Sequence, residues 1–113
     1  MTTFERGDVV LVPVPFSDLS AVKKRPAVVI SSDEHNRQSV DLVITAITSR
    51  SFMPGRVGEC VLEKWSEAGL AKPSVVKPAV STIEQRLVTR KLGRLVPDDQ
   101  RNLDAALRSL LQL

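Results

Sequence analysis

The stretch Asp8-Val9-Val10-Leu11-Val12-Pro13-Val14 decides the fold of this chain, together with a second run from Pro26 to Ser32. Both runs are almost unbroken series of β-branched and apolar residues, as is typical of buried β-strands. The residues between them, Ser17 to Arg25, show no apolar periodicity and end in the basic triplet Lys23-Lys24-Arg25. We therefore predict two strands joined by a hairpin loop.

The rest of the chain continues as short strands and closes with a helix. After the polar stretch 31–39, strands are expected at 41–47 and 58–63, with a turn at Pro54-Gly55 between them. Residues 63–69 suit one helical turn with Gly69 as its C-cap. Three further short strands are expected at 74–77, 80–84 and 87–95, where the interruption by Pro78 is typical of strands at a sheet edge.

The C-terminal segment has the signals of an amphipathic helix. Pro97 suits its first turn, and Asp98 and Asp99 suit the positive end of the helix dipole. Its apolar stripe consists of Leu103, Leu107, Leu110 and Leu111. We expect this stripe to pack on the sheet or on a partner.

These elements predict a mainly β protein, an antiparallel, strongly curved sheet in the form of a small barrel with a C-terminal α-helix. No segment between the early strands is a helix of crossover length, so those strands cannot run parallel. A length of 113 residues fits one domain, residues 1–113. The 42% hydrophobic and 26% charged content indicates a packed globule.

Composition also limits the setting and the chemistry. Cys60 is the only cysteine, which excludes an intramolecular disulfide and a cysteine-rich metal site. No signal peptide is evident at the N-terminus, and no apolar run approaches the ~20 residues that span a membrane, so a cytoplasmic protein is expected. The net charge of +3 and pI near 9.4 are compatible with a polyanionic partner without requiring one.

Most enzyme classes lack their signatures here. The sequence has no zinc-type cluster, no phosphate-cradling glycine loop and no nucleophile elbow, so neither a metal nor a cofactor is expected. His35 is the only histidine, which excludes a pair of histidines acting as acid and base within one chain. A single histidine beside Glu34 and Asn36 in a polar stretch is typical of a solvated loop.

Arg25 and Thr48 are more informative, because both stand where predicted strands give way to loops. Cleavage of RNA by its own 2′-hydroxyl passes through a phosphorane with additional negative charge. A fixed guanidinium and a hydroxyl donor would stabilise that species without a metal. The pattern alone leaves the ordinary roles open: a surface charge for the arginine and a strand-end hydroxyl for the threonine.

Five segments in order resemble the MazF/PemK/Kid family of toxins. The first three are Arg6-Gly7-Asp8-Val9-Val10, Lys24-Arg25-Pro26-Ala27-Val28-Val29-Ile30-Ser31 and Ala46-Ile47-Thr48-Ser49. Two more follow as Ala68-Gly69-Leu70-Ala71-Lys72-Pro73-Ser74-Val75-Val76 and Ser81-Thr82-Ile83-Glu84-Gln85-Arg86-Leu87, and Leu92-Gly93-Arg94-Leu95 fits the family's close. The resemblance covers nearly the whole chain.

The resemblance implies an SH3-like antiparallel barrel and the toxin of a type II toxin-antitoxin system. Such a toxin is a homodimer that cleaves single-stranded mRNA at short sequences without a metal or cofactor. Its cognate antitoxin occupies the RNA groove. By position, Arg25 is the main catalytic group and Thr48 helps to stabilise the phosphorane.

The chain departs from its relatives in two places. Some members carry a Glu five residues before the catalytic arginine, where this chain has Ser20; Asp18 is the nearest carboxylate and the candidate general base. Others carry an Arg, an Asp and a Gln where this chain reads Val76, Lys77, Pro78 and Ala79. Lys77 is the candidate replacement for the missing cation.

The remaining candidate RNA contacts are polar residues in the predicted loops. Lys23, Lys24, Arg50 and Arg56 lie beside Arg25 or Thr48 and suit phosphate contacts that position RNA without distinguishing its bases. Asn36 also fits the family pattern. Two alternatives stay open at this point: a non-catalytic barrel that binds RNA or protein, and a gyrase-poisoning toxin of the same fold.

Overall fold

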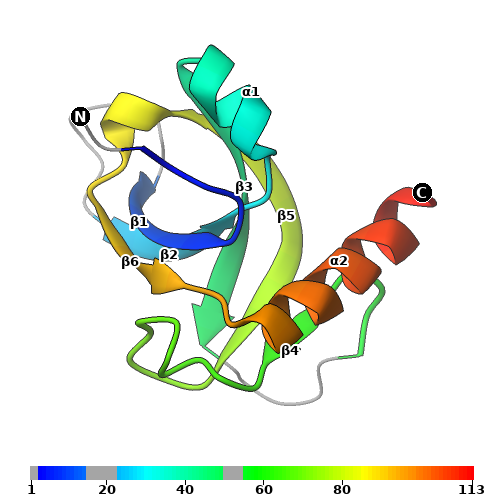
Figure 1. The fold of residues 1–113 in the computed structure, drawn as a ribbon. Coiled ribbons are helices and arrows are strands. Elements are labelled where there is room, and N and C mark those ends of the chain that lie inside the picture. The colour runs from blue at the N-terminus through cyan, green and yellow to red at the C-terminus, as the bar shows by residue number, and fades with distance from the viewer. Residues whose placement is uncertain (1–2, 15–22, 50–54) are drawn as a thin grey trace.

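The computed structural model describes residues 3–14, 23–49 and 55–113, and its strands form one antiparallel sheet. The elements in chain order are β1 (Asp8–Val14), β2 (Lys23–Val29), α1 (Asp33–Gln38), β3 (Asp41–Ser49), β4 (Cys60–Leu62), β5 (Ser74–Glu84), the 3-10 turn η1 (Gln85–Leu87), β6 (Arg90–Arg94) and α2 (Pro97–Leu111). The sheet order is β4-β5-β3-β2-β1-β6. Figure 1 shows the sheet curled into a half-barrel, with α2 beside β4 and β5. The predicted mainly β architecture with a C-terminal helix is confirmed.

The continuous apolar runs of β1 and β2 arise because both faces of the curled sheet are covered. Val9 and Val28 face a helix-side cluster, the buried group that contains Leu103 and Leu107 of α2. The alternate residues face a second group, the Phe4-side cluster, made of Phe4, Val10, Val12, Ala27, Val29, Leu42, Ile44 and Ile83. A strand buried on both faces has no polar alternation, which accounts for the pattern that identified these strands.

The basic triplet 23–25 belongs to strand β2, so the prediction that it lies in a loop was wrong. Val14, Pro13 and Val12 of β1 pair with Lys23, Lys24 and Arg25. β2 therefore begins earlier than expected and ends at Val29. These three residues are held in the strand by backbone hydrogen bonding to β1, and their charged side chains give no apolar pattern that would predict a strand.

The polar stretch 31–39 contains helix α1, where the sequence indicated only a loop. Ser32 caps this helix by accepting a hydrogen bond from the backbone N–H of His35, at 3.1 Å. His35 is half-buried on the helix, and its Nε2 is buried without a hydrogen-bond partner among the described residues. This helix is short and is held by polar hydrogen bonds, so its sequence has no apolar periodicity from which it could be predicted.

β5 is one strand rather than two, and Pro78 marks a bulge in it. The pairing with β3 passes from Val76–Ile47 to Val80–Thr45, so residues 77–79 form the irregularity. The hydroxyl of Thr45 donates to the carbonyl of Lys77 inside this bulge. A proline is tolerated there because the ladder is already interrupted. The strand expected at 87–95 is confined to β6, after η1.

The segment 63–69 joins the two open edges of the sheet. In Figure 1 the chain after β4 runs toward β6 before it returns as β5. Gly69 has a φ of +89°, and a Cβ on it would lie 2.1 Å from the carbonyl oxygen of Leu92. A Cβ on Gly93 would lie 2.2 Å from the carbonyl oxygen of Ala68. Only glycine permits this backbone approach.

Asp99 at the start of α2 holds the same segment from the other side. Its buried carboxylate accepts hydrogen bonds from the backbone N–H groups of Glu63, at 3.1 Å, and Lys64, at 2.9 Å. Trp65 packs against the helix-side cluster, as expected of a tryptophan with an apolar surface to bury.

Among the described residues, no helix is long and apolar enough to cross a membrane.

Gly93→Ala should destabilise the protein, because the new methyl group would force the 63–69 segment away from β6. We expect the free energy of unfolding to fall by about 2 to 4 kcal/mol, as for other substitutions that overpack a rigid contact. Gly55→Ala is the matched control, since no atom of the described residues beyond its chain neighbours lies within 4 Å of its Cβ position. Urea denaturation measures both variants, and equal stabilities would contradict this packing.

Cys60 should be chemically inert in the folded protein. Burial, with Asp99 and Glu63 nearby, raises the pKa of this thiol to about 11. The protonated thiol therefore persists at pH 8, whereas an unfolded thiol with a pKa of about 8.5 is partly thiolate. Reaction with Ellman's reagent at pH 8 should be roughly 100-fold slower without urea than with it. Similar rates in the two conditions would show that Cys60 is accessible.

Candidate functional site

The pairing of β2 with β3 brings Arg25 and Thr48 together. The paired residues are Val29–Ile44, Val28–Thr45 and Ala27–Ala46. Continued two residues further, this register sets Arg25 opposite Thr48. Both side chains are exposed at this end of the sheet. The two residues that were expected to act on one phosphate thus meet across neighbouring strands.

Arg25 and Thr48 line one open pocket of about 420 Å³. The other residues that line it are Pro26, Ile47, Ser49, Leu70, Ala71, Lys72 and Ser74. Ile47 and Leu70 are buried and make an apolar part of its wall. The guanidinium of Arg25, the ammonium of Lys72 and the hydroxyls of Thr48 and Ser49 come from exposed residues, whereas Ser74 is buried. We refer to this pocket as the Arg25 pocket.

One wall of the Arg25 pocket is the segment between Gly69 and β5. Gly69 turns the chain out of the 63–69 segment, and Leu70 packs in the helix-side cluster. Ser74, the first residue of β5, lies opposite Ser49 and donates its hydroxyl to the carbonyl of Lys72, at 2.7 Å. The backbone of Lys72 is thereby fixed beside the end of β3.

The Arg25 pocket carries positive charge, and no acidic residue is among the described residues that line it. Several other cations of the described chain form ion pairs. Lys91 and Arg94 contact the buried carboxylate of Asp8, each at 3.1 Å. Arg6, Arg86 and Arg101 pair with Asp104, Glu84 and Asp98. Arg25 and Lys72 take part in none of the ion pairs among the described residues, so their charge is available to an anion.

The other predicted RNA contacts that the structure describes do not line the Arg25 pocket. Lys24 points to the hydroxyl of Thr89, at 3.4 Å, whereas Lys23 shares the face of Arg25 by strand alternation. Arg56 is exposed, and its backbone N–H binds Glu59, at 3.0 Å. Lys77 is exposed on β5. Their contacts with RNA remain predictions.

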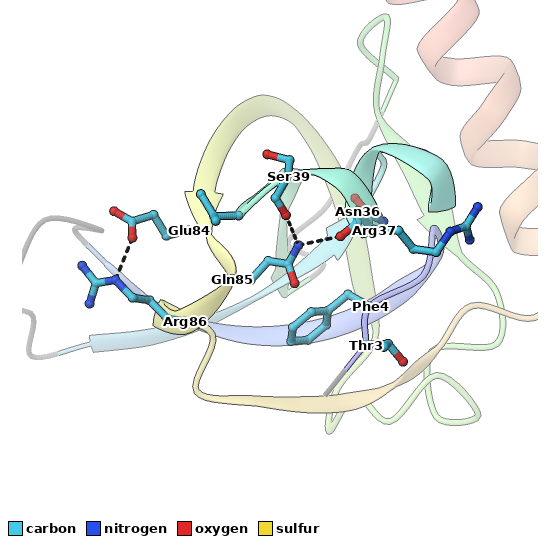
Figure 2. Close-up of a pocket in the computed structure, with 9 residues that line it drawn as sticks. Thr3, Phe4, Asn36, Arg37, Ser39, Glu84, Gln85 and Arg86 are labelled. Carbon is cyan, nitrogen blue, oxygen red and sulfur yellow. Dashed lines mark hydrogen bonds and ion pairs between the residues drawn. The ribbon is translucent and has the colours of Figure 1, made fainter. Parts of the chain in front are cut away.

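Asn36 lies at a different pocket, which Figure 2 shows beside Phe4 and Gln85. Its side chain is buried, accepts the hydroxyl of Ser31 at 2.5 Å and donates to the carbonyl of Ser31 at 3.2 Å. Gln85 donates to the backbone carbonyls of both Asn36 and Ser39, each at 2.9 Å. Asn36 therefore anchors α1 in this structure, and its proposed contact with RNA remains a prediction.

Two candidate residues fall outside the described part of the chain. Asp18, the candidate general base, lies in 15–22, and Arg50, a candidate phosphate contact, lies in 50–54. Among the described residues no three His, Cys, Asp or Glu side chains are grouped in a way that could hold a metal ion.

Lys72 is the pocket residue that sequence reasoning missed as a site. It follows Gly69 closely and precedes Pro73, a context that indicates only a connecting loop. Its place in the pocket depends on the contact of the 63–69 segment with β6, which joins parts of the chain far apart in sequence. The one feature of the sequence that could have indicated a site role for Lys72 is its position inside a segment that resembles the toxin family.

Comparison with known proteins identifies the family of this chain. A family model described as "PemK-like, MazF-like toxin of type II toxin-antitoxin system" matches residues 5–111. The chain belongs to this toxin family. None of the curated proteins compared with it matches.

Solved structures share the fold of this PemK/MazF-like chain. An endoribonuclease in complex with its cognate antitoxin from a mycobacterial species has a TM-score of 0.78 and 21% identity, over 100% of this chain and 97% of its own. MazF from Deinococcus radiodurans has a TM-score of 0.75 and 20% identity, over 100% of each chain. Mycobacterium tuberculosis toxin MazF-mt6 has the same TM-score and identity, over 94% of this chain and 97% of its own.

Proposed function

We propose that this PemK/MazF-like chain is an endoribonuclease that cleaves single-stranded mRNA at short sequences in the cytoplasm. The observation that carries the proposal is the meeting of Arg25 and Thr48 in one open, cationic pocket. The mycobacterial relative, named an endoribonuclease, supports it. The pocket is open to solvent, as access for an RNA chain requires.

Attack on phosphorus by the ribose 2′-oxygen forms one P–O bond, and the bond to the 5′-oxygen then breaks. The products are a 2′,3′-cyclic phosphate and a 5′-hydroxyl end. The guanidinium of Arg25 donates two N–H groups to the non-bridging oxygens, where charge accumulates in the phosphorane. The hydroxyl of Thr48 donates a further hydrogen bond there.

Arg25 acts through its charge rather than as a base, because a guanidinium in a protein keeps its protons. A separate group must accept the proton of the 2′-hydroxyl, and the departing 5′-oxygen must receive one. Asp18 is the carboxylate nearest to Arg25 in sequence, and we propose it as the base. The stabilising half of the site and its proton-transfer half thus come from different segments.

The proposed partners are a second copy of the chain and a cognate antitoxin. The side chains of Pro78 and Leu110 lie against Gly58, and Val57, Val80 and Leu111, near these residues in sequence, are exposed apolar residues. Exposed apolar side chains of this kind suit self-association. The mycobacterial endoribonuclease was solved with its antitoxin, which supports an antitoxin for this chain.

The purified protein should cleave a long single-stranded RNA in excess EDTA and leave the two ends named above. Arg25→Ala should lower the cleavage rate by at least about 100-fold, and Thr48→Val by a smaller factor, as for loss of a transition-state hydrogen-bond donor. End-mapping by sequencing and gel assays with radiolabelled RNA measure ends and rate.

Arg101→Ala is the matched control, because Arg101 is an exposed arginine on α2 whose only recorded partner among the described residues is Asp98. Its activity should match that of the wild type. Full activity of Arg25→Ala would remove Arg25 from the mechanism. No cleavage of a sequence-diverse RNA pool by the wild type would favour a binding module instead of an enzyme.

A further inference from the structure

Lys72 is the second cation of the Arg25 pocket. It lines the pocket with Arg25 and Thr48 although it comes from a segment more than twenty residues further along the chain. Its side chain is exposed and belongs to none of the ion pairs among the described residues. A lysine placed this way has its charge available for a ligand that enters the pocket.

The backbone that carries Lys72 is fixed on both sides. Before it, Gly69 lies against Leu92 of β6 and Leu70 is buried. After it, the Ser74 hydroxyl binds the carbonyl of Lys72, and Ser74 pairs with Ser49 of β3. The backbone position of Lys72 is therefore set by the fold. Binding of a ligand then has to order only the side chain, which lowers the entropic cost.

The chemistry of the pocket favours a polyanion that spans both cations. A lysine ammonium is a point charge that binds phosphate without the two-pronged geometry of arginine. Successive phosphates of an RNA strand each carry one negative charge. Within the described part of the chain, no acidic residue lines the pocket to compete with them.

We infer that Lys72 binds a backbone phosphate of the RNA strand whose scissile phosphate is held by Arg25. The inference rests on the proposed function and adds a substrate-binding residue to it. Lys72 contributes to affinity and to its dependence on salt, and it does not distinguish bases. Arg25 thus binds the reacting phosphate, and Lys72 binds a neighbouring phosphate of the same strand.

Binding of a 2′-O-methyl RNA pool of random sequence tests this assignment, because the missing 2′-hydroxyl prevents cleavage. Lys72→Gln should weaken binding about three- to tenfold at moderate salt. It should also reduce the slope of log K against log salt by about 0.7, the value for one lost phosphate contact on a single strand. Fluorescence anisotropy over a salt series measures both quantities.

Lys64→Gln is the matched control, since Lys64 is an exposed lysine on the neighbouring 63–69 segment that does not line the pocket. It should bind RNA like the wild type, and Lys72→Arg should keep the wild-type slope. In cleavage assays Lys72→Gln should raise KM. Its kcat should change less than twofold, so the activation free energy of the chemical step should change by less than roughly RT ln 2.

Wild-type affinity and slope in Lys72→Gln, or the same loss in Lys64→Gln, would overturn the inference while the proposed function stands. A fall in kcat at unchanged KM would overturn it too, because Lys72 would then act on the transition state. A wild-type protein that cleaves no RNA overturns the proposed function itself, a result that the cleavage assay reports separately. Thermal unfolding checks that each variant is folded.

Discussion

The backbone approach between the 63–69 segment and β6 is the constraint on which the rest of the structure depends. The sheet has open edges at β4 and β6, and the contact of Gly69 with Leu92 and of Ala68 with Gly93 joins the chain beyond β4 to β6. The buried carboxylate of Asp99 holds the same segment through its backbone N–H groups. Side chains larger than hydrogen at either glycine would separate the edges.

This closure also forms the site. Arg25 and Thr48 are placed by the β2–β3 register alone, but an open sheet end would leave them on a flat surface. The segment that leaves Gly69 adds Leu70 and Lys72 as a wall, so the same contact that completes the core turns two exposed strand ends into a pocket. One short segment therefore contributes both to the core and to the candidate site.

The sequence predicted the strands and the terminal helix well. Burial on both faces leaves continuous apolar runs in β1 and β2, and burial on one face leaves an apolar stripe in α2. It placed Arg25 and Thr48 at strand ends, and strand pairing brings them together as expected. It missed α1, which polar bonds around Asn36 anchor, and the single strand β5, whose proline occupies a bulge. It also missed Lys72 as a site residue, because only tertiary closure brings this residue to Arg25.

We propose that RNA binds in the pocket formed by this closure. Mapping of amide chemical shifts by NMR on addition of a 2′-O-methyl RNA tests the claim most directly. The largest shifts should lie at the start of β2, at the end of β3 and in the segment between Gly69 and Ser74. Shifts centred instead on α1 and the pocket beside Phe4 would contradict it.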